Sequence, residues 1–315
     1  MRTSFEPILL VHGGAGNIPD DMVDAYVTGI RAARDAGWVV LERGGTAVDA
    51  VEAAITVMED DGSFDAGRGS VLNQDGRVQL DAMIMDGESL AAGGIGGVET
   101  VRNPIRVARA VMDRSPHVYF AGVGADRFAA EHGFEPVDNA ALVTPRERRR
   151  FDAALEQAIT GRRVEASLAE TGFAHDTVGA VALDGNGDLA AGTSTGGISY
   201  KAVGRIGDSS IIGSGCYADN ASAAVSCTGE GEAIMRLVLG KWAVDRVAEG
   251  LSPQDAAQAA IDRLGARLRA NGGLILLDRT GRPGVAFNSS RMAWGMRTVS
   301  TSTATVATRD DVAAG

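Results

Sequence analysis

The sequence is poor in the residues that build disulfide scaffolds and metal centres. Its 315 residues include two cysteines, Cys216 and Cys227, and four histidines at positions 12, 117, 132 and 175. Two cysteines do not make a disulfide framework, so we expect a reducing, cytoplasmic setting. The histidines lack the short spacing of metal-ligand pairs, which argues against a zinc site.

Long apolar runs and an excess of positive charge are also missing. No stretch approaches the ~18 continuous apolar residues of a membrane span. The apolar run near the start, ILLV, is too short for a secretory signal. The formal net charge is −11, which argues against a nucleic-acid partner because such binding rests on a basic surface. The basic run RERRR at 146–150 is typical of a solvated surface helix.

Glycine, in contrast, is abundant. The 42 glycines are about double the usual share of ~7%. They follow no collagen-like period, so they indicate tight corners and close approaches of the backbone. With 45% hydrophobic and 23% charged residues, the composition is that of a globular protein with a substantial core.

Apolar periodicity predicts helices and strands in both halves of the chain. The predicted helices are 20–43, one from Thr46, 104–132 with a short strand near Val118, 230–249 and 253–270. The predicted strands are 8–16, two runs around a corner at 74–76, 178–183, 188–193, 210–213, a short one near Tyr217, 273–278, 284–287 and 293–296. Helices on the outside of strands from both halves predict a layered α/β sandwich.

Residues 139–176 interrupt this pattern. The segment is polar and helix-prone up to Phe173 and carries the arginine run. We expect it to be a flexible connector. It ends directly before Thr177, which opens a predicted strand.

Three threonines lie on glycine-rich corners, namely Thr177 in DTVG, Thr195 in TSTGG and Thr228 in CTGEG. A threonine hydroxyl is a weak nucleophile until a base removes its proton, and no Ser/His/Asp order is evident. An N-terminal threonine can use its own α-amine, whose pKa of ~7.7–8.0 leaves a useful neutral fraction near pH 7. The other interpretation is that Thr177 is a β-favourable residue at the start of a strand.

Thr177 becomes N-terminal only if the Asp176–Thr177 bond is cut. Its own hydroxyl can attack the carbonyl of Asp176 and shift the acyl group from nitrogen to oxygen, and hydrolysis of the ester then frees the amine. A flexible connector would let the new end leave the site. His175 and Asp176 either assist this cleavage or are a solvated end of the connector.

Several motifs occur in order along the chain. They are HGGAG (12–16), FDAGRGSVLN to QLDAMIMDG (64–87), TVGAVALD (177–184), TSTGG (193–197), GRIGDS (204–209) and CTGEGEAIMR (227–236). Together they resemble the plant-type asparaginases, also called isoaspartyl peptidase/L-asparaginases, over about residues 6–297. That family belongs to the N-terminal-nucleophile hydrolases.

The resemblance implies a fold and an activity. The expected fold is a four-layer αββα sandwich, with residues 1–315 as a single domain that cleaves itself into chains 1–176 and 177–315. The expected reaction is hydrolysis of L-asparagine to L-aspartate and ammonia, of β-aspartyl (isoaspartyl) dipeptides, or of both. The resemblance also implies a homodimer of processed units and no organic cofactor. A loop at 58–67 corresponds to one that wraps a structural sodium ion through backbone carbonyls.

The resemblance assigns catalytic roles to the three threonines. Thr177 matches the nucleophile, and Thr195 resembles the threonine whose hydroxyl orients it. Thr228 and the backbone N–H of Gly229 match the oxyanion site. An alternative for Thr195 is a turn threonine that bonds to its own backbone.

Three further residues resemble the substrate-binding set. A substrate attacked at its side chain keeps a free α-carboxylate and α-ammonium. Arg205 can hold the carboxylate with two parallel bonds, and Asp208 can hold the ammonium. Gly231 resembles a backbone contact to the substrate amine. The alternative for Arg205 and Asp208 is an ordinary surface salt bridge.

Two positions depart from the family. Asp65 replaces an asparagine near the active site, where its carboxylate is expected to change the ordering of water or weaken binding of an acidic substrate. Asp176 occupies a position where most members have glycine, and HDT is closer to the N4-(β-N-acetylglucosaminyl)-L-asparaginases, a second enzyme hypothesis. A third, of another class, is an unprocessed, non-catalytic binding protein.

Overall fold

The computed structural model describes residues 5–160 and 177–308. Its strands are β1 (Ile8–Gly16), β2 (Leu80–Asp86), β3 (Ala92–Val98), β4 (Tyr119–Ala121), β5 (Val178–Leu183), β6 (Leu189–Thr195), β7 (Cys216–Ala218), β8 (Ala223–Gly229), β9 (Gly272–Asp278), β10 (Pro283–Phe287), β11 (Arg291–Arg297) and β12 (Ser302–Thr308). Its α-helices are α1 (Val23–Glu42), α2 (Ala47–Asp61), α3 (Pro104–Arg114), α4 (Gly122–Glu131), α5 (Pro145–Ile159), α7 (Gly231–Leu237), α8 (Leu239–Ala248) and α9 (Pro253–Leu268). Two 3₁₀ helices are η1 (Asp20–Met22) and η2 (Asn139–Leu142).

The strands form two sheets. The larger one has the order β12-β11-β1-β5-β6-β2-β3-β4, and the smaller one the order β10-β9-β8-β7. All described pairings between named strands are antiparallel except that of β3 with β4. The central strands of the larger sheet, β1, β5 and β6, contact β8 of the smaller sheet, so the two sheets face each other.

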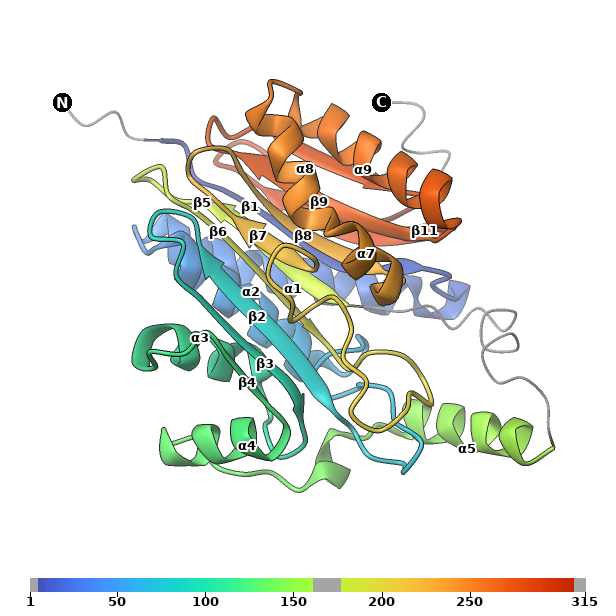
Figure 1. The fold of residues 1–315 in the computed structure, drawn as a ribbon. Coiled ribbons are helices and arrows are strands. Elements are labelled where there is room, and N and C mark those ends of the chain that lie inside the picture. Colours follow the sequence, from blue (N-terminus) through green and yellow to red (C-terminus); the bar gives the residue numbers. More distant parts are fainter. Residues whose placement is uncertain (1–4, 161–176, 309–315) are drawn as a thin grey trace.

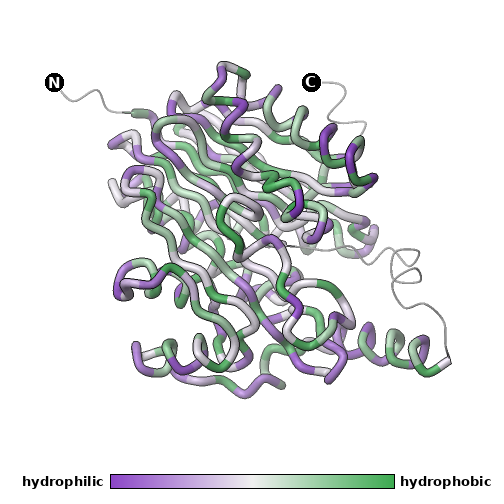
Figure 2. The backbone as a smooth tube through the Cα atoms, viewed as in Figure 1, coloured by the Kyte–Doolittle hydropathy of each residue, from purple (hydrophilic) through white to green (hydrophobic). Residues whose placement is uncertain are grey.

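Three groups of buried apolar side chains hold this arrangement together. One lies between the larger sheet and the helices α1, α2 and α3. A second joins residues of both sheets, among them Leu10, Val181 and Ile275. The third lies between the smaller sheet and the helices α8 and α9, which cover it in Figure 1. The chain is therefore a mixed α/β protein whose helices pack against sheets, and Figure 2 shows the hydrophobic residues gathered along its strands.

The helices begin where the sequence supplies a cap. Thr46 accepts a hydrogen bond from the Asp49 amide at the start of α2, and Ser252 does the same for Asp255 at the start of α9. At the end of α2, Gly62 adopts a left-handed φ of 81°, which suits glycine. The helices expected at 20–43, from Thr46 and at 253–270 are confirmed to within a few residues.

Other expected elements are wrong. The run before the 74–76 corner is a loop, with isolated bridges from Leu72 to Val78 and from Asn73 to Lys201. Residues 210–213 lie outside the named strands. The single helix expected at 230–249 is broken at Val238, whose φ is 48°. Strands β3, β8 and β12 were not predicted.

The first part of the expected connector is folded. Residues 139–159 contain η2 and α5, and the buried Asn139 bonds to the backbone of Val78 and Glu99. The flexible connector predicted for 139–176 therefore does not include residues 139–159. Residues 161–176 lie outside the described residues. Among the described helices, none combines the length and the apolar character needed to cross a membrane.

Candidate active site

Thr177 is buried at the start of β5, in the middle of the larger sheet. Its Oγ1 lies 3.1 Å from the Oγ of Ser209. The backbone oxygen of Ser209 in turn accepts a hydrogen bond from Thr193 Oγ1 at 2.5 Å. The nucleophile candidate is thus held by the segment that directly follows Asp208.

Thr195 lies beside Thr177. Val178 pairs with Ser194 in the antiparallel β5–β6 ladder, so extending the register by one residue sets Thr177 opposite Thr195. The Thr195 hydroxyl accepts a hydrogen bond from the Gly197 amide at 3.0 Å. This is the turn contact named above as the alternative, and the same hydroxyl still has donor capacity toward a neighbour.

Thr228 and Gly229 end strand β8, which crosses β5 and β6 on the facing sheet. Thr228 is fully buried, and within residues 5–160 and 177–308 its hydroxyl has no hydrogen-bond partner. Gly229 has φ of 135°, and a Cβ there would lie 2.5 Å from Gly272 Cα, so only glycine fits. A buried hydroxyl without a partner among the described residues, next to a glycine with positive φ, is suited to hydrogen-bond a bound ligand.

Among residues 5–160 and 177–308, the structure offers Thr177 no conventional base. In the described part of the chain, no imidazole or carboxylate hydrogen-bonds to its hydroxyl. His12 lies on β1, opposite Gly179 of β5, with Nε2 2.7 Å from Ser226 Oγ. Burial lowers the pKa of its imidazole to about 3, although a hydrogen bond to the backbone of Thr177 opposes this change, so His12 stays neutral at physiological pH.

Arg205, Asp208 and Gly231 come together. A Cβ on Gly231 would lie 2.9 Å from Asp208 Oδ1 and 3.0 Å from Arg205 Nη2, so this glycine leaves room for both side chains. Asp208 is buried, and its Oδ2 has no hydrogen-bond partner among the residues that the structure describes. Burial raises the pKa of Asp208 to about 7, while the Arg205 guanidinium opposes the shift.

Asp65 is buried in the loop after α2, next in space to the glycine corner that follows Thr195. Its Oδ1 accepts a hydrogen bond from the Val71 amide, and its backbone oxygen accepts one from the Gly196 amide. The Asp65 carboxylate thus supports its own loop, and the Asp65 backbone oxygen supports the threonine corner. Its charge acts on Lys201, whose ammonium is itself buried.

Four residues of this region were not singled out from the sequence: Ser209, Lys201, Asp81 and Glu232. Lys201 Nζ donates to the backbone oxygen of Gln79 at 2.9 Å. Burial lowers the pKa of Lys201, while the carboxylates of Asp81 and Asp65 oppose this change. Ser209, Glu232 and Asp81 stand inside the motifs GRIGDS, CTGEGEAIMR and QLDAMIMDG, so the motifs carried a signal for them. Asp176, the residue before the expected cleavage point, lies outside the described residues.

The family model for asparaginase matches residues 5–307. The chain belongs to the asparaginase family. The isoaspartyl peptidase/L-asparaginase of Bos taurus is 43% identical over 292 residues, 92% of this chain and 92% of the relative. The proteins of that name from Homo sapiens and Xenopus laevis are 42% and 40% identical over 291 and 290 residues, again with 92% of each chain covered.

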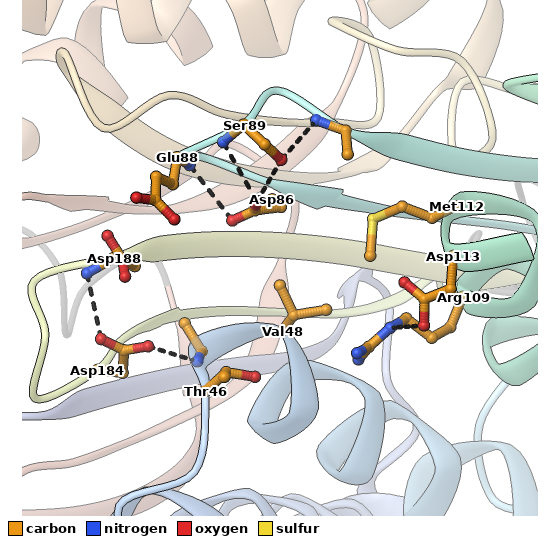
Figure 3. A pocket seen from close by; sticks show the side chains of 12 residues that line it. Thr46, Val48, Asp86, Glu88, Ser89, Arg109, Met112, Asp113, Asp184 and Asp188 are labelled. Carbon is orange, nitrogen blue, oxygen red and sulfur yellow. Dashed lines mark hydrogen bonds and ion pairs between the residues drawn. The ribbon is translucent and has the colours of Figure 1, made fainter. Parts of the chain in front are cut away.

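This asparaginase-family chain has a cavity at the end of β5 opposite to Thr177, lined by Asp184 and other residues (Figure 3). The cavity measures about 280 Å³ and is lined by several carboxylates. Asp184 accepts hydrogen bonds from the amides of Ala47, Asn186 and Asp188, and Asp86 accepts from those of Glu88 and Ser89. These carboxylates cap turns, and the described residues contain no His/Cys/Asp/Glu group suited to a metal ion.

Proposed function

We propose that the protein is a threonine amidohydrolase that cleaves itself before Thr177 and hydrolyses L-asparagine, β-aspartyl dipeptides, or both. The observation that carries this proposal is the contact between the Thr177 and Ser209 hydroxyls. It joins Thr177, the nucleophile candidate directly before β5, to the residue that follows Asp208 in the segment with Arg205. The names of the relatives in the asparaginase family support the same substrates.

The reaction uses the free amine of Thr177 as the base. The amine takes the proton from Oγ1, which attacks the side-chain carbonyl carbon of the substrate. When the carbon–nitrogen bond breaks, the proton passes to the leaving nitrogen, and ammonia or an amino acid departs. Water then attacks the aspartyl ester, releases L-aspartate and restores the threonine.

Binding groups fix the orientation of the substrate. Arg205 holds the α-carboxylate and Asp208 the α-ammonium, with Gly231 close to both. Thr228 Oγ1 and the Gly229 amide face the oxygen that becomes negative during attack. Such donors matter because removing one typically slows an enzyme by ~10²–10³. Thr195 orients Thr177 from the opposite strand.

Processing and activity are tested together. Denaturing electrophoresis and mass spectrometry of the purified protein should show chains 1–176 and 177–315. Thr177→Ala should stay intact and inactive, while Val178→Ala, one residue away, should be processed normally. An intact chain with full activity, or an active Thr177→Ala variant, would contradict the proposal. The single intact chain without activity is the result that a non-catalytic binding protein would give.

Substrate preference is tested on the processed protein. L-Asparagine, β-aspartyl-leucine and an N-glycosylated asparagine are compared at equal concentration. We expect the first two to be hydrolysed and the third to be left intact. Preferential release of the sugar amine would favour the glycosylasparaginase hypothesis that Asp176 raised.

The proposal also covers the fold type, the oligomeric state, the cellular setting and a sodium site. The two facing sheets with helices outside them support the αββα sandwich of the N-terminal-nucleophile hydrolases. The homodimer of processed units rests on the family resemblance, and the cytoplasmic setting rests on the low cysteine content. The stretch 58–67 consists of the last turn of α2 and the loop that follows Asp61, and the two pack tightly, since a Cβ on Gly67 would lie 2.6 Å from the Glu59 carbonyl oxygen. This closure supports a sodium site lined by backbone carbonyl oxygens. Such a site should give the protein a higher melting temperature in sodium chloride than in choline chloride.

A further inference from the structure

The guanidinium of Arg205 is already occupied by a carboxylate of the same chain. Arg205 Nε and Nη2 each donate to an oxygen of Glu232, both at 2.8 Å. This parallel, two-bond geometry is the one that an arginine offers to a carboxylate ligand. Glu232 thus takes the place that the proposed function gives to the α-carboxylate of the substrate.

The two partners differ in how firmly they are held. The Arg205 side chain is 14% exposed, whereas that of Glu232 is 60% exposed. A Cβ on Gly207 would lie 2.9 Å from Arg205 Nη1, so the guanidinium is packed against backbone on that side. Arg205 is therefore the more closely packed partner, and Glu232, on the first turn of α7, is mostly exposed to solvent.

Electrostatic repulsion prevents Glu232 and the substrate α-carboxylate from binding Arg205 at the same time. With Glu232 in place, a substrate α-carboxylate at Arg205 would face a second carboxylate at close range, and Asp208 already adds a third acidic group nearby. Like charges at such distances repel. Swinging Glu232 outward removes the repulsion and frees both N–H groups for the substrate.

We propose that Glu232 is an intramolecular competitor for the carboxylate clamp, and so a residue that sets the affinity for substrates with a free α-carboxylate. This inference rests on the proposed function, because it takes Arg205 as the clamp. An exposed ion pair contributes little, so the competition is mild. We expect Glu232→Gln to lower the KM for L-asparagine and the inhibition constant of L-aspartate by about two- to fivefold. The kcat should stay within about twofold, since Glu232 touches no reacting atom.

The experiment compares processed wild type, Glu232→Gln and a matched control. Glu249→Gln removes the same charge from an exposed pair with Arg246 at the end of α8. Two inhibitors are titrated against each protein: L-aspartate, and β-alanine, which is the same molecule without the α-carboxylate. Tighter L-aspartate inhibition in Glu232→Gln alone, with β-alanine unchanged or too weak to measure, supports the proposal.

Three results would overturn it. A higher KM and inhibition constant in Glu232→Gln would mean that Glu232 positions Arg205 instead of competing for it. Unchanged constants would mean that Glu232 stays in place when the ligand binds. An equal gain for β-alanine, or in Glu249→Gln, would reduce the effect to general electrostatics.

Failure of this inference is distinguishable from failure of the proposed function. If wild type hydrolyses neither L-asparagine nor β-aspartyl-leucine, the function is wrong whatever Glu232 does. The rise in melting temperature with added L-aspartate still reports on the clamp in that case, because it needs no turnover. A larger rise in Glu232→Gln than in wild type supports competition, and an equal or smaller one contradicts it.

Discussion

At the scale of a single residue, substrate binding and burial have opposite effects on the charge of Asp208. It must be charged to hold the ammonium of the substrate, yet its burial disfavours the charge. Burial raises the pKa of Asp208 from an ordinary 3.8 to about 7. Because the folded pKa lies above the unfolded one, this group makes the fold less stable as pH rises from about 3.8 to about 7.

The affinity for L-aspartate should therefore depend on pH. Below about 7 the free protein carries a neutral Asp208, so the inhibition constant of L-aspartate should rise about tenfold from pH 8 to pH 6. Titration of the Thr177 amine would affect kcat as well, whereas Asp208 acts through binding. Asp208→Asn should bind weakly at every pH and should be at least as stable as wild type above pH 7. A constant affinity from pH 6 to pH 8 in wild type would show that Asp208 is charged throughout.

Removing the Thr228 hydroxyl by substitution can separate an effect on catalysis from an effect on stability. It is buried, and no described residue hydrogen-bonds to it. Thr228→Val keeps the shape and removes only this group, so the melting temperature should hold or rise while kcat falls by ~10²–10³. Steady-state kinetics and thermal unfolding of the processed variant check both parts. A loss of stability with normal kcat would place the hydroxyl in the fold and not in the oxyanion site.

The threonine corners could be predicted from the sequence because the chemistry is concentrated in short motifs. The burial and pairing of the charges around them could not, although the family resemblance placed Asp65 and Asp208 near the site. Lys201 is compensated by Asp65 and Asp81, which lie more than a hundred residues away in the chain. A sequence shows such charges as ordinary surface residues, since burial and pairing arise only when distant segments fold together.

At the scale of elements, two of the missed strands, β3 and β8, have a common physical cause. Strand β3 reads AGGIGGV, which has little strand propensity. Its glycines serve close packing, since a Cβ on Gly93 would lie 2.0 Å from the backbone oxygen of Ala108 in α3. Strand β8 is similarly rich in small residues.

The break at Val238 allows the amide of Lys241 in α8 to bond to the Gly213 carbonyl, a tertiary contact that helical periodicity cannot report.

Helix α5 gives a prediction at this scale. In Figure 1 it lies at the edge of the molecule, and Phe151 is its main anchor: the ring is 5.9 Å from that of Tyr200 and lies over the Gly76 turn. Phe151→Ala should cost about 3 kcal/mol of docking free energy. We expect faster tryptic cleavage at 146–150 with little change in the melting temperature, because the loss is local.

A control lies on the same helix. Ile159 is 76% exposed, so Ile159→Ala should leave the cleavage rate of wild type unchanged. Equal cleavage of wild type and both variants would show that Phe151 does not anchor the helix.

At the scale of the whole molecule, the proposed cleavage divides the larger sheet between two chains, while the smaller sheet lies entirely in residues 177–315. In the larger sheet, β1, β2, β3 and β4 belong to residues 1–176, and β5, β6, β11 and β12 to residues 177–315. The strands are interleaved: β1 lies between β11 and β5, and β2 pairs with β6. Neither chain can complete the sheet alone.

The processed chains should therefore remain one particle. Size-exclusion chromatography in native buffer should give a single peak that contains both chains, and only denaturant should separate them. Residues 1–176 produced alone should be insoluble or unfolded, because β1 would lose both of its neighbours and expose the apolar residues Leu9, Leu10 and Val11. Thermal unfolding of the processed protein should also depend on its concentration, as for any assembly whose parts separate when they unfold. A soluble 1–176 chain with a cooperative melt would mean that the interleaved sheet is not what holds the two chains together.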